Sequence, residues 1–256
     1  MSSVLVTGST DGIGQETART LTGMGHRVVV HARDERRAAD ARATAPRAAA
    51  IVVGDLASLE ETRTLAAAAD REGPYDAVIH NAGVGATARR ETTVDGLERI
   101  FQVNVVAPYL LTALMARPAR LVYLTSGLQA RGRIDLDDLQ HARGRWDGEQ
   151  AYSDSKLCDL LLAFAVARHW PGVRSNAVDP GWIRTRMGGP GAPGLLPEGA
   201  ETPVWLAVSD DPEALVSGRY LQRRRQLRAN PAAGDGELQR ALLDRCAVLT
   251  GVTLPR

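Results

Sequence analysis

Residues 3–14 read SVLVTGSTDGIG, a short apolar run that leads into three glycines at positions 8, 12 and 14. The run is rich in valine, which is typical of a buried strand, and helical spacing follows the last glycine. Because glycine has no Cβ, the chain can turn tightly there, and the free N–H groups and dipole of the helix favour a bound diphosphate. The spacing is G-x3-G-x-G rather than G-x-G-x-x-G, so a purely structural turn stays open as the alternative.

The same alternation of strand and helix continues along the chain. Ser58 with Glu61 forms a capping-box pattern, and Asp34 can cap the second helix. The alternation predicts an α/β fold, a doubly wound sheet of about seven parallel strands with helices on both faces, in one domain over residues 1–256. The predicted strands are residues 3–7, 27–31, 49–53, 76–80, 120–125, 173–178 and 218–222, and the predicted helices are residues 13–24, 34–45, 58–71, 94–115, 151–169, 202–208 and 236–249.

Composition excludes several classes of protein. The 256 residues are 44% hydrophobic, enough for a large core and too apolar for a disordered chain. The 31 basic and 30 acidic residues leave a net charge of +1, which does not favour nucleic acid or a membrane surface. Two cysteines without metal-ligand spacing, scattered histidines, no leader and no apolar run of ~20 residues predict a cytoplasmic protein without a metal site.

Two irregular segments follow the carboxyl ends of predicted strands. Residues 127–150 contain Gly, Arg and Asp without a strand pattern, and residues 181–199 form a loop rich in Gly and Pro. Ligands bind at that edge of open α/β sheets, so both segments are candidate substrate walls. A tolerated surface insertion is the alternative.

The end of the second strand indicates the coenzyme. It reads His31-Ala32-Arg33, where a site for NAD would place Asp or Glu on the ribose 2′-hydroxyl. With Ala32 in place of an acid, no carboxylate would repel a 2′-phosphate, and the guanidinium of Arg33 can bind that phosphate with two hydrogen bonds. These residues therefore predict NADP(H). In the alternative, Arg33 is an exposed loop residue.

Tyr152 and Lys156 are the candidate acid–base pair. They lie four residues apart in a helical stretch and so share a face, and Lys156 is the one lysine of the chain. A free phenol has a pKa of about 10, and a fixed cation beside it stabilises the phenolate. The opposite face of this helix is apolar, with Leu160 and Phe164 either packing on the sheet or forming a subunit interface.

Several further motifs occur in order along the chain. They are Thr7-Gly8-x-x-x-Gly12-Ile13-Gly14, Asp55-Leu56, Asn81-Ala82-Gly83, Asn104 in Val103-Asn104-Val105, Ser126 at the end of a strand, Tyr152-x-x-x-Lys156, and Pro180-Gly181 with Thr185. With these motifs the chain resembles the short-chain dehydrogenase/reductase family over nearly its whole length, in the compact single-domain form with a Rossmann-type sheet. The segment between Ser126 and Tyr152 is similar to the branch of retinol dehydrogenases and the WW-domain oxidoreductase.

The resemblance implies reversible hydride transfer between NADP(H) and an alcohol, ketone or aldehyde. Tyr152 would pass the proton, Ser126 would position the substrate oxygen, Lys156 would stabilise the phenolate and hold the ribose, and Asn104 would anchor a water. It also implies a small-molecule substrate and a homodimer or homotetramer. The implied coenzyme-binding residues are Gly8, Ser9, Thr10, Gly12, Ile13, Gly14, Arg33, Asp55, Leu56, Asn81, Ala82, Gly83, Tyr152, Lys156, Pro180, Gly181, Ile183 and Thr185.

Three alternatives to these assignments exist. Thr125 competes with Ser126 as the hydroxyl, although alternation along a strand sends the two side chains to opposite sides. A serine hydrolase is disfavoured because Ser126 lacks the flanking glycines of a nucleophile elbow. The rival function is a protein that binds NADP(H) as a sensor or scaffold without turnover.

Overall fold

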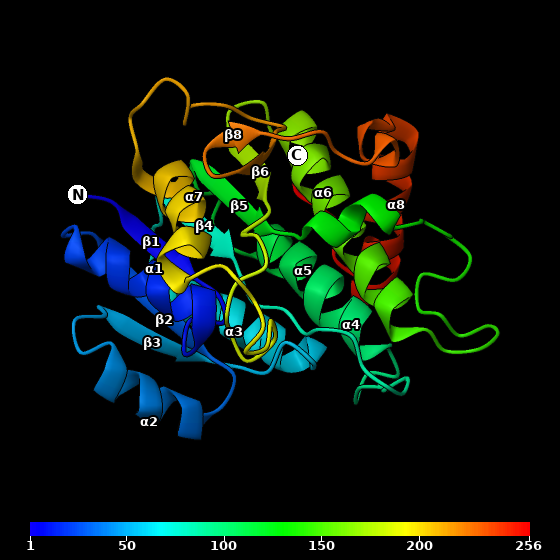
Figure 1. The fold of residues 1–256 in the computed structure, drawn as a ribbon, viewed down its shortest axis with the longest axis horizontal. Coiled ribbons are helices and arrows are strands. Elements are labelled where there is room, and N and C mark those ends of the chain that lie inside the picture. The colour runs from blue at the N-terminus through cyan, green and yellow to red at the C-terminus, as the bar shows by residue number, and fades with distance from the viewer.

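The computed structural model describes the backbone of residues 1–256 and all side chains except those of residues 43 and 44. Its centre is one sheet in the order β3-β2-β1-β4-β5-β6-β7-β8 (Figure 1). Neighbouring strands from β3 to β7 are parallel, and β8 runs antiparallel to β7. The strands are β1 Ser3–Val6, β2 Arg27–Ala32, β3 Ala50–Val53, β4 Ala77–His80, β5 Arg120–Leu124, β6 Arg174–Val178, β7 Tyr220–Gln222 and β8 Arg225–Gln226.

Helices cover both faces of this sheet, as predicted. Both predicted N-caps are present: Asp34 accepts from the Arg37 N–H at 2.8 Å, and Ser58 accepts from the Glu61 N–H at 3.2 Å. The full capping box was wrong, because the Glu61 carboxylate accepts from the Asp55 N–H at 2.8 Å instead of the Ser58 N–H. The helices are α1 Gly12–Gly23, α2 Glu35–Thr44, α3 Leu59–Glu72, α4 Arg99–Phe101, α5 Ala107–Leu114, α6 Gly148–His169, α7 Leu196–Val208 and α8 Gly236–Thr250, with a π turn at Gln102–Val106 and 3₁₀ turns at Gly127–Arg131 and Pro231–Gly234.

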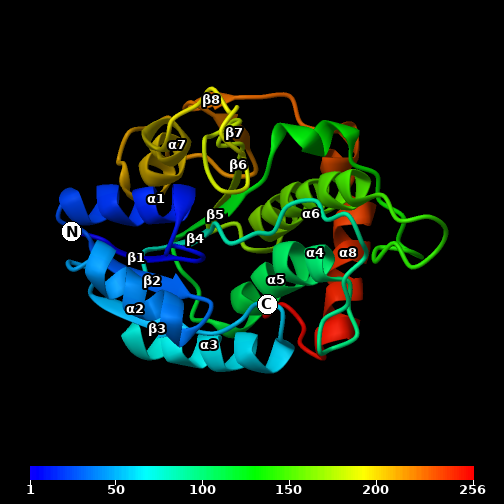
Figure 2. The ribbon, with the colours of Figure 1, turned by 60° about the horizontal axis from the view of Figure 1, so that its bottom comes forward.

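The two faces of the sheet have separate apolar cores. Val4 and Val6 of β1 pack in the core under α1 and α7, whereas Leu5 between them packs in the core under α3, α5 and α6. This follows from the alternation of side chains along a strand. Figure 2 shows α1 and α7 on one side of the sheet and α3 and α5 on the other.

α8 closes the outer side of α6. Leu242 and Cys246 of α8 are buried in the same core as Leu160, and Phe164 packs against that core. Leu160 is therefore buried within the chain, whereas Phe164 is half-buried at the edge of the same core. Among the described residues, no helix combines the length and apolar character needed to cross a membrane.

Three elements differ from the predicted ones. The helix predicted over residues 94–115 begins at Arg99 because Glu98 caps it, accepting from two backbone N–H groups, and it contains the π turn. α7 begins at Leu196 rather than at Thr202. The eighth strand, β8, was not predicted, because it depends on a turn in which Arg223 and Arg224 both have positive φ.

Candidate active site

A glycine turn joins β1 to α1 at the carboxyl edge of the sheet. Gly8 and Gly12 have φ of 60° and 56°, a backbone conformation that residues with a Cβ rarely adopt. A Cβ at Gly14 would clash with the Asn81 side-chain amide and the Gly8 carbonyl. The turn therefore leaves an open backbone cradle at a helix N-terminus, which fits the diphosphate of a dinucleotide.

The segment Asn81-Ala82-Gly83 after β4 is tied to this turn. Asn81 Nδ2 donates to the carbonyls of Thr7 and Gly8 at 2.8 and 3.0 Å, and Thr7 Oγ1 accepts from the backbone N–H of Asn81 and Ala82. β1 and β4 are the neighbours at which the strand order reverses, the place where open α/β sheets bind ligands. Two of the predicted coenzyme motifs thus lie together.

His31, near the end of β2, supports the turn from below, a role that sequence reasoning missed. Its Nδ1 accepts from the Gly8 N–H at 2.9 Å, and Nε2 lies 2.8 Å from the Gly54 carbonyl. Because Nδ1 accepts, the ring proton is on Nε2. Burial lowers the pKa of His31, so the imidazole is neutral. It connects the glycine turn to the end of β3 through these two contacts.

The predicted adenosine-binding residues follow the adjacent strands β2 and β3. Arg33 comes directly after β2, and its side chain is 52% exposed with Nε 3.4 Å from the Asp34 carboxylate. That carboxylate is engaged as the cap of α2. Asp55 accepts from the Ala57 N–H at 2.9 Å, and Leu56 beside it is buried.

Tyr152 and Lys156 are one turn apart on α6. Lys156 Nζ lies 5.8 Å from the centroid of the Tyr152 ring. The tyrosine is half-buried, whereas the lysine is 5% exposed and donates to the Leu124 carbonyl at 2.9 Å and to Asp159 Oδ2 at 2.8 Å. The ammonium is therefore fixed between α6 and the carboxyl end of β5.

The hydroxyls at the end of β5 separate as the strand alternation requires. Thr125 is buried and donates to the Lys156 carbonyl at 2.6 Å, so its hydroxyl is occupied in the core. Ser126 is half-buried and caps the following 3₁₀ turn, accepting from the Leu128 N–H at 3.2 Å. Of the two, Ser126 is the one left at the edge of the sheet.

Asn104 lies inside the π turn, and its side chain joins three segments. Its Oδ1 accepts from the Val84 N–H at 2.8 Å, and its Nδ2 donates to the Val84 carbonyl and to Ser155 Oγ on α6. A Cβ at Gly83 would lie 3.3 Å from Asn104 Oδ1 and 3.5 Å from Lys156 Nζ. The structure thus brings Asn104, Gly83 and Lys156 together.

The loop after β6 begins with Asp179, which precedes Pro180 and accepts from the Gly181 N–H at 2.8 Å. Gly181 has φ of 87°, so the turn requires glycine. Thr185 reaches the glycine turn: a Cβ at Gly12 would lie 3.3 Å from its methyl group. Ile183, in contrast, is buried between Gly194 of the loop and Gly199 of α7.

Arg186 and Met187, which follow Thr185, also contact residues of the site. Arg186 lies 3.3 Å from Asp11, the cap of α1, which also lies 3.9 Å from Arg37. The Tyr152 hydroxyl donates a long hydrogen bond to Met187 Sδ at 4.0 Å. Sequence reasoning named the loop as a substrate wall but did not identify Met187 beside the phenol.

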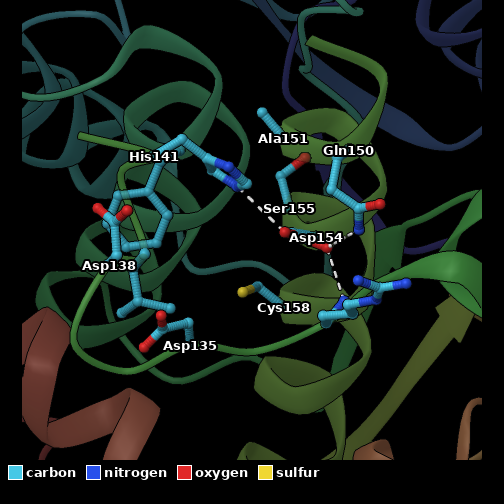
Figure 3. Close-up of a pocket in the computed structure, with 11 residues that line it drawn as sticks. Asp135, Asp138, His141, Gln150, Ala151, Asp154, Ser155 and Cys158 are labelled. Atoms are coloured by element: carbon cyan, nitrogen blue, oxygen red, sulfur yellow. Dashed lines mark hydrogen bonds and ion pairs between the residues drawn. The ribbon is translucent and has the colours of Figure 1, made fainter. Parts of the chain in front are cut away.

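Residues 132–150 are held against α6 by contacts with Asp154. Asp154 accepts from the Arg133 N–H at 2.6 Å and from Gln150 at 2.7 Å, and it lies 3.0 Å from His141 Nε2. These residues line a cavity of about 210 Å³. Figure 3 shows His141, Gln150 and Asp154 around it, with Ser155 and Cys158 on its wall. Ser126, Tyr152 and Lys156 do not line it.

The comparisons with known proteins agree with this arrangement. A family model described as short chain dehydrogenase matches residues 2–193. An uncharacterized oxidoreductase of Emericella nidulans is 40% identical over 257 residues and covers 98% of each chain. Human retinol dehydrogenase 13 is 34% identical over 284 residues, which span 98% of this chain and 85% of that protein. The chain belongs to the short-chain dehydrogenase/reductase family, on its retinol dehydrogenase branch.

Solved structures give the same fold. A protein of Mycobacterium paratuberculosis covers 100% of this chain and 96% of its own with a TM-score of 0.85 and 28% identity. A blue fluorescent protein from a metagenomic library, in complex with NADPH, covers 86% of this chain and 95% of its own with a TM-score of 0.70 and 25% identity. As a family member, the chain is an NAD(P)-dependent oxidoreductase that acts on CH–OH and carbonyl groups.

Proposed function

We propose that the protein is an NADP(H)-preferring oxidoreductase that interconverts an alcohol with a ketone or aldehyde, with Tyr152 as the general acid and base. The observation that supports it most is the position of Lys156. Its ammonium is held at the end of β5 by the Leu124 carbonyl and lies 5.8 Å from the centroid of the Tyr152 ring. A fixed cation stabilises the phenolate, so the phenol can both give and take a proton.

The proposal assigns a role to each site residue. A bound nicotinamide supplies or accepts the hydride. Tyr152 moves a proton to or from the substrate oxygen, and Ser126 donates a hydrogen bond that positions that oxygen. Lys156 would also contact the ribose. Asn104 holds the segment after β4 against α6 through Val84 and Ser155, and we propose that it also anchors the water that relays protons from Lys156.

The remaining predicted residues would hold the coenzyme. The backbone from Gly8 to Gly14, with Ser9, Thr10 and Ile13, would bind the diphosphate, because it is the open cradle at the start of α1. Asp55 and Leu56 would contact the adenine, Asn81 to Gly83 the adenosine ribose, and Pro180 to Thr185 the nicotinamide. Ile183 would act through the backbone of its loop, since its side chain is buried.

The proposed preference for NADP(H) is based on Arg33. Its side chain is half-exposed at the end of β2, and the only acid beside it in sequence, Asp34, is occupied as a helix cap. The NADPH bound by the metagenomic relative agrees with this proposal. Steady-state kinetics with both coenzymes test it: we expect kcat/KM with NADPH to exceed that with NADH, and a preference for NADH would contradict it.

We propose a single domain over residues 1–256, since one sheet collects all eight strands, and a cytoplasmic location. The family resemblance favours a homodimer or homotetramer. Leu160 is fully buried within the chain and so would not contact a partner subunit, and light scattering measures the mass that decides the oligomeric state.

Fluorescence titration with NADPH, followed by turnover assays on a panel of ketones, aldehydes and alcohols, separates this function from a silent sensor. We expect saturable binding and NADPH consumption with at least one carbonyl compound. Saturable binding without turnover on any of them would favour the sensor.

A further inference from the structure

Asp159 is a buried carboxylate one turn beyond Lys156 on α6, and the mechanism above gives it no task. It is 3% exposed and accepts from Lys156 Nζ at 2.8 Å, while the Leu124 carbonyl accepts from the same ammonium at 2.9 Å. Leaving water costs a carboxylate several kcal/mol, so its presence in the core calls for a partner. That partner is the chain's one lysine, the group on which the proposed function depends.

Apart from Lys156, the titratable groups that interact with Asp159 among the described residues are uncharged near neutral pH. Tyr123 of β5 and Cys158 of α6 have pKa values raised by burial. Behind Tyr123, His80 of β4 stacks on its ring and burial lowers the pKa of that histidine to about 3. Cys246 of α8, which faces Cys158, has its pKa raised by burial to about 12.

Among the described residues, Lys156 is therefore the charged partner of Asp159. Burial raises the pKa of the Asp159 carboxyl to about 6, and Asp159 with Tyr152 raises the pKa of Lys156 against the effect of burial. At neutral pH the pair is an ammonium and a carboxylate in contact. The fields of the ammonium and the carboxylate largely cancel at a distance. The phenol of Tyr152 is therefore close to a cation whose charge is compensated by Asp159.

We propose that Asp159 is a positioning residue for the reaction: it holds Lys156 Nζ against the end of β5 and, as its counter-ion, sets the pH at which Tyr152 gains and loses its proton. The inference rests on the proposed function. Removing the negative charge while keeping a hydrogen-bond acceptor would leave the ammonium uncompensated, which favours the phenolate.

The chain offers a direct readout that needs no substrate. Burial raises the pKa of each of the other four tyrosines, that of Tyr109 to about 12. The phenolate absorbance that is absent from Tyr152→Phe therefore reports Tyr152. In Asp159→Asn, saturated with NADP⁺, we expect its midpoint to fall by about one pH unit.

Asp154→Asn is the matched control, because it makes the same chemical change on the same helix, on the side that holds residues 132–150. Its midpoint should equal that of the unchanged chain. An Asp159→Asn midpoint that is unchanged or higher overturns the proposal. If Asp159→Asn does not fold, Asp159→Ser is the second neutral variant, with the same expectation.

A measurement on the unchanged chain applies even if neither variant folds. Because the chain has one lysine, labelling with ¹⁵N-lysine gives a single Nζ resonance in NMR spectra. This resonance should shift as Asp159 titrates around pH 6, and no shift would overturn the proposal. Turnover by Tyr152→Phe at the normal rate would instead overturn the proposed function, so the two failures are distinguishable.

Discussion

At the scale of residues, Tyr152 and Lys156 could be found from their spacing, but the partners of Lys156 could not. Residues four apart share a helix face, so the pair is visible in the sequence. The contacts with the Leu124 carbonyl and with Asp159 exist because β5 packs against α6, and no local pattern encodes that packing. The same holds for His31, which looks like any other histidine until its burial is known.

Replacing Tyr152 by Phe tests the role of its hydroxyl. General acid–base catalysis contributes roughly 10²- to 10⁴-fold, so kcat of Tyr152→Phe should fall by about that factor while the Kd for NADPH stays largely unchanged. Tyr75→Phe is the control, because that hydroxyl donates to the Ala69 carbonyl in the core. An active Tyr152→Phe enzyme would refute the assignment.

At the scale of elements, the glycine turn shows how strand, turn and helix together form a binding surface. The sequence predicted the turn from residue types alone. It did not reveal that Gly14 is pressed against Asn81, a residue 67 positions away, since that contact depends on β1 and β4 being neighbours.

We expect Gly14→Ala to weaken NADPH binding strongly and to cost about 1–3 kcal/mol of stability, because its Cβ would displace the Asn81 amide or the Gly8 carbonyl. Isothermal titration calorimetry and urea unfolding measure both effects. Gly23→Ala in the same helix has open space around it and should be neutral or stabilising by up to about 1 kcal/mol. Equal behaviour of the two variants would contradict this account of the turn.

The contact between His141, in the segment of residues 132–150, and Asp154 of α6 depends on pH. His141 has φ of 48°, a strained conformation for a residue with a Cβ, and it lies 3.0 Å from Asp154. The hydrogen bond to Asp154 raises the pKa of His141. A pKa raised on folding means that the folded state binds the proton more tightly, so the stabilisation is complete below about pH 6.5 and is lost as the pH rises through the raised value.

His141→Asn isolates that effect, because Asn tolerates positive φ but does not titrate. We expect the unchanged chain to be more stable than His141→Asn by up to about 1 kcal/mol below pH 6.5, with the difference shrinking at higher pH. Urea unfolding of both proteins across this pH range measures it. A difference that grows with pH would have the wrong sign.

Two elements could not be predicted for identifiable reasons. β8 requires a tight turn, and Arg223-Arg224 lacks the Asn-Gly or Asp-Gly signal of such turns. The π turn at Gln102–Val106 has the same apolar periodicity as an α-helix over so short a length, so the sequence predicted a continuous helix. Both depend on tertiary contacts, the first through Thr202 Oγ1 and the second through Asn104.

At the scale of the whole molecule, the order of the strands accounts for where the site lies. The seven parallel strands were predicted to within two residues at each end, because buried parallel strands are continuous apolar runs. The carboxyl ends of β1, β2, β4, β5 and β6 meet at one edge, and each carries one of the predicted motifs. The cavity beside Asp154 depends instead on how residues 132–150 fold back on α6.

The proposed function requires that hydride from the coenzyme reach a carbonyl carbon while Tyr152 donates a proton to the carbonyl oxygen. Incubation of the protein with NADPH deuterated at both C4 positions and the carbonyl panel, with mass spectrometry of the products, tests this directly. We predict deuterium on the carbinol carbon with the unchanged chain and its loss with Tyr152→Phe. Tight NADPH binding with no deuterated product from any carbonyl compound would contradict the account.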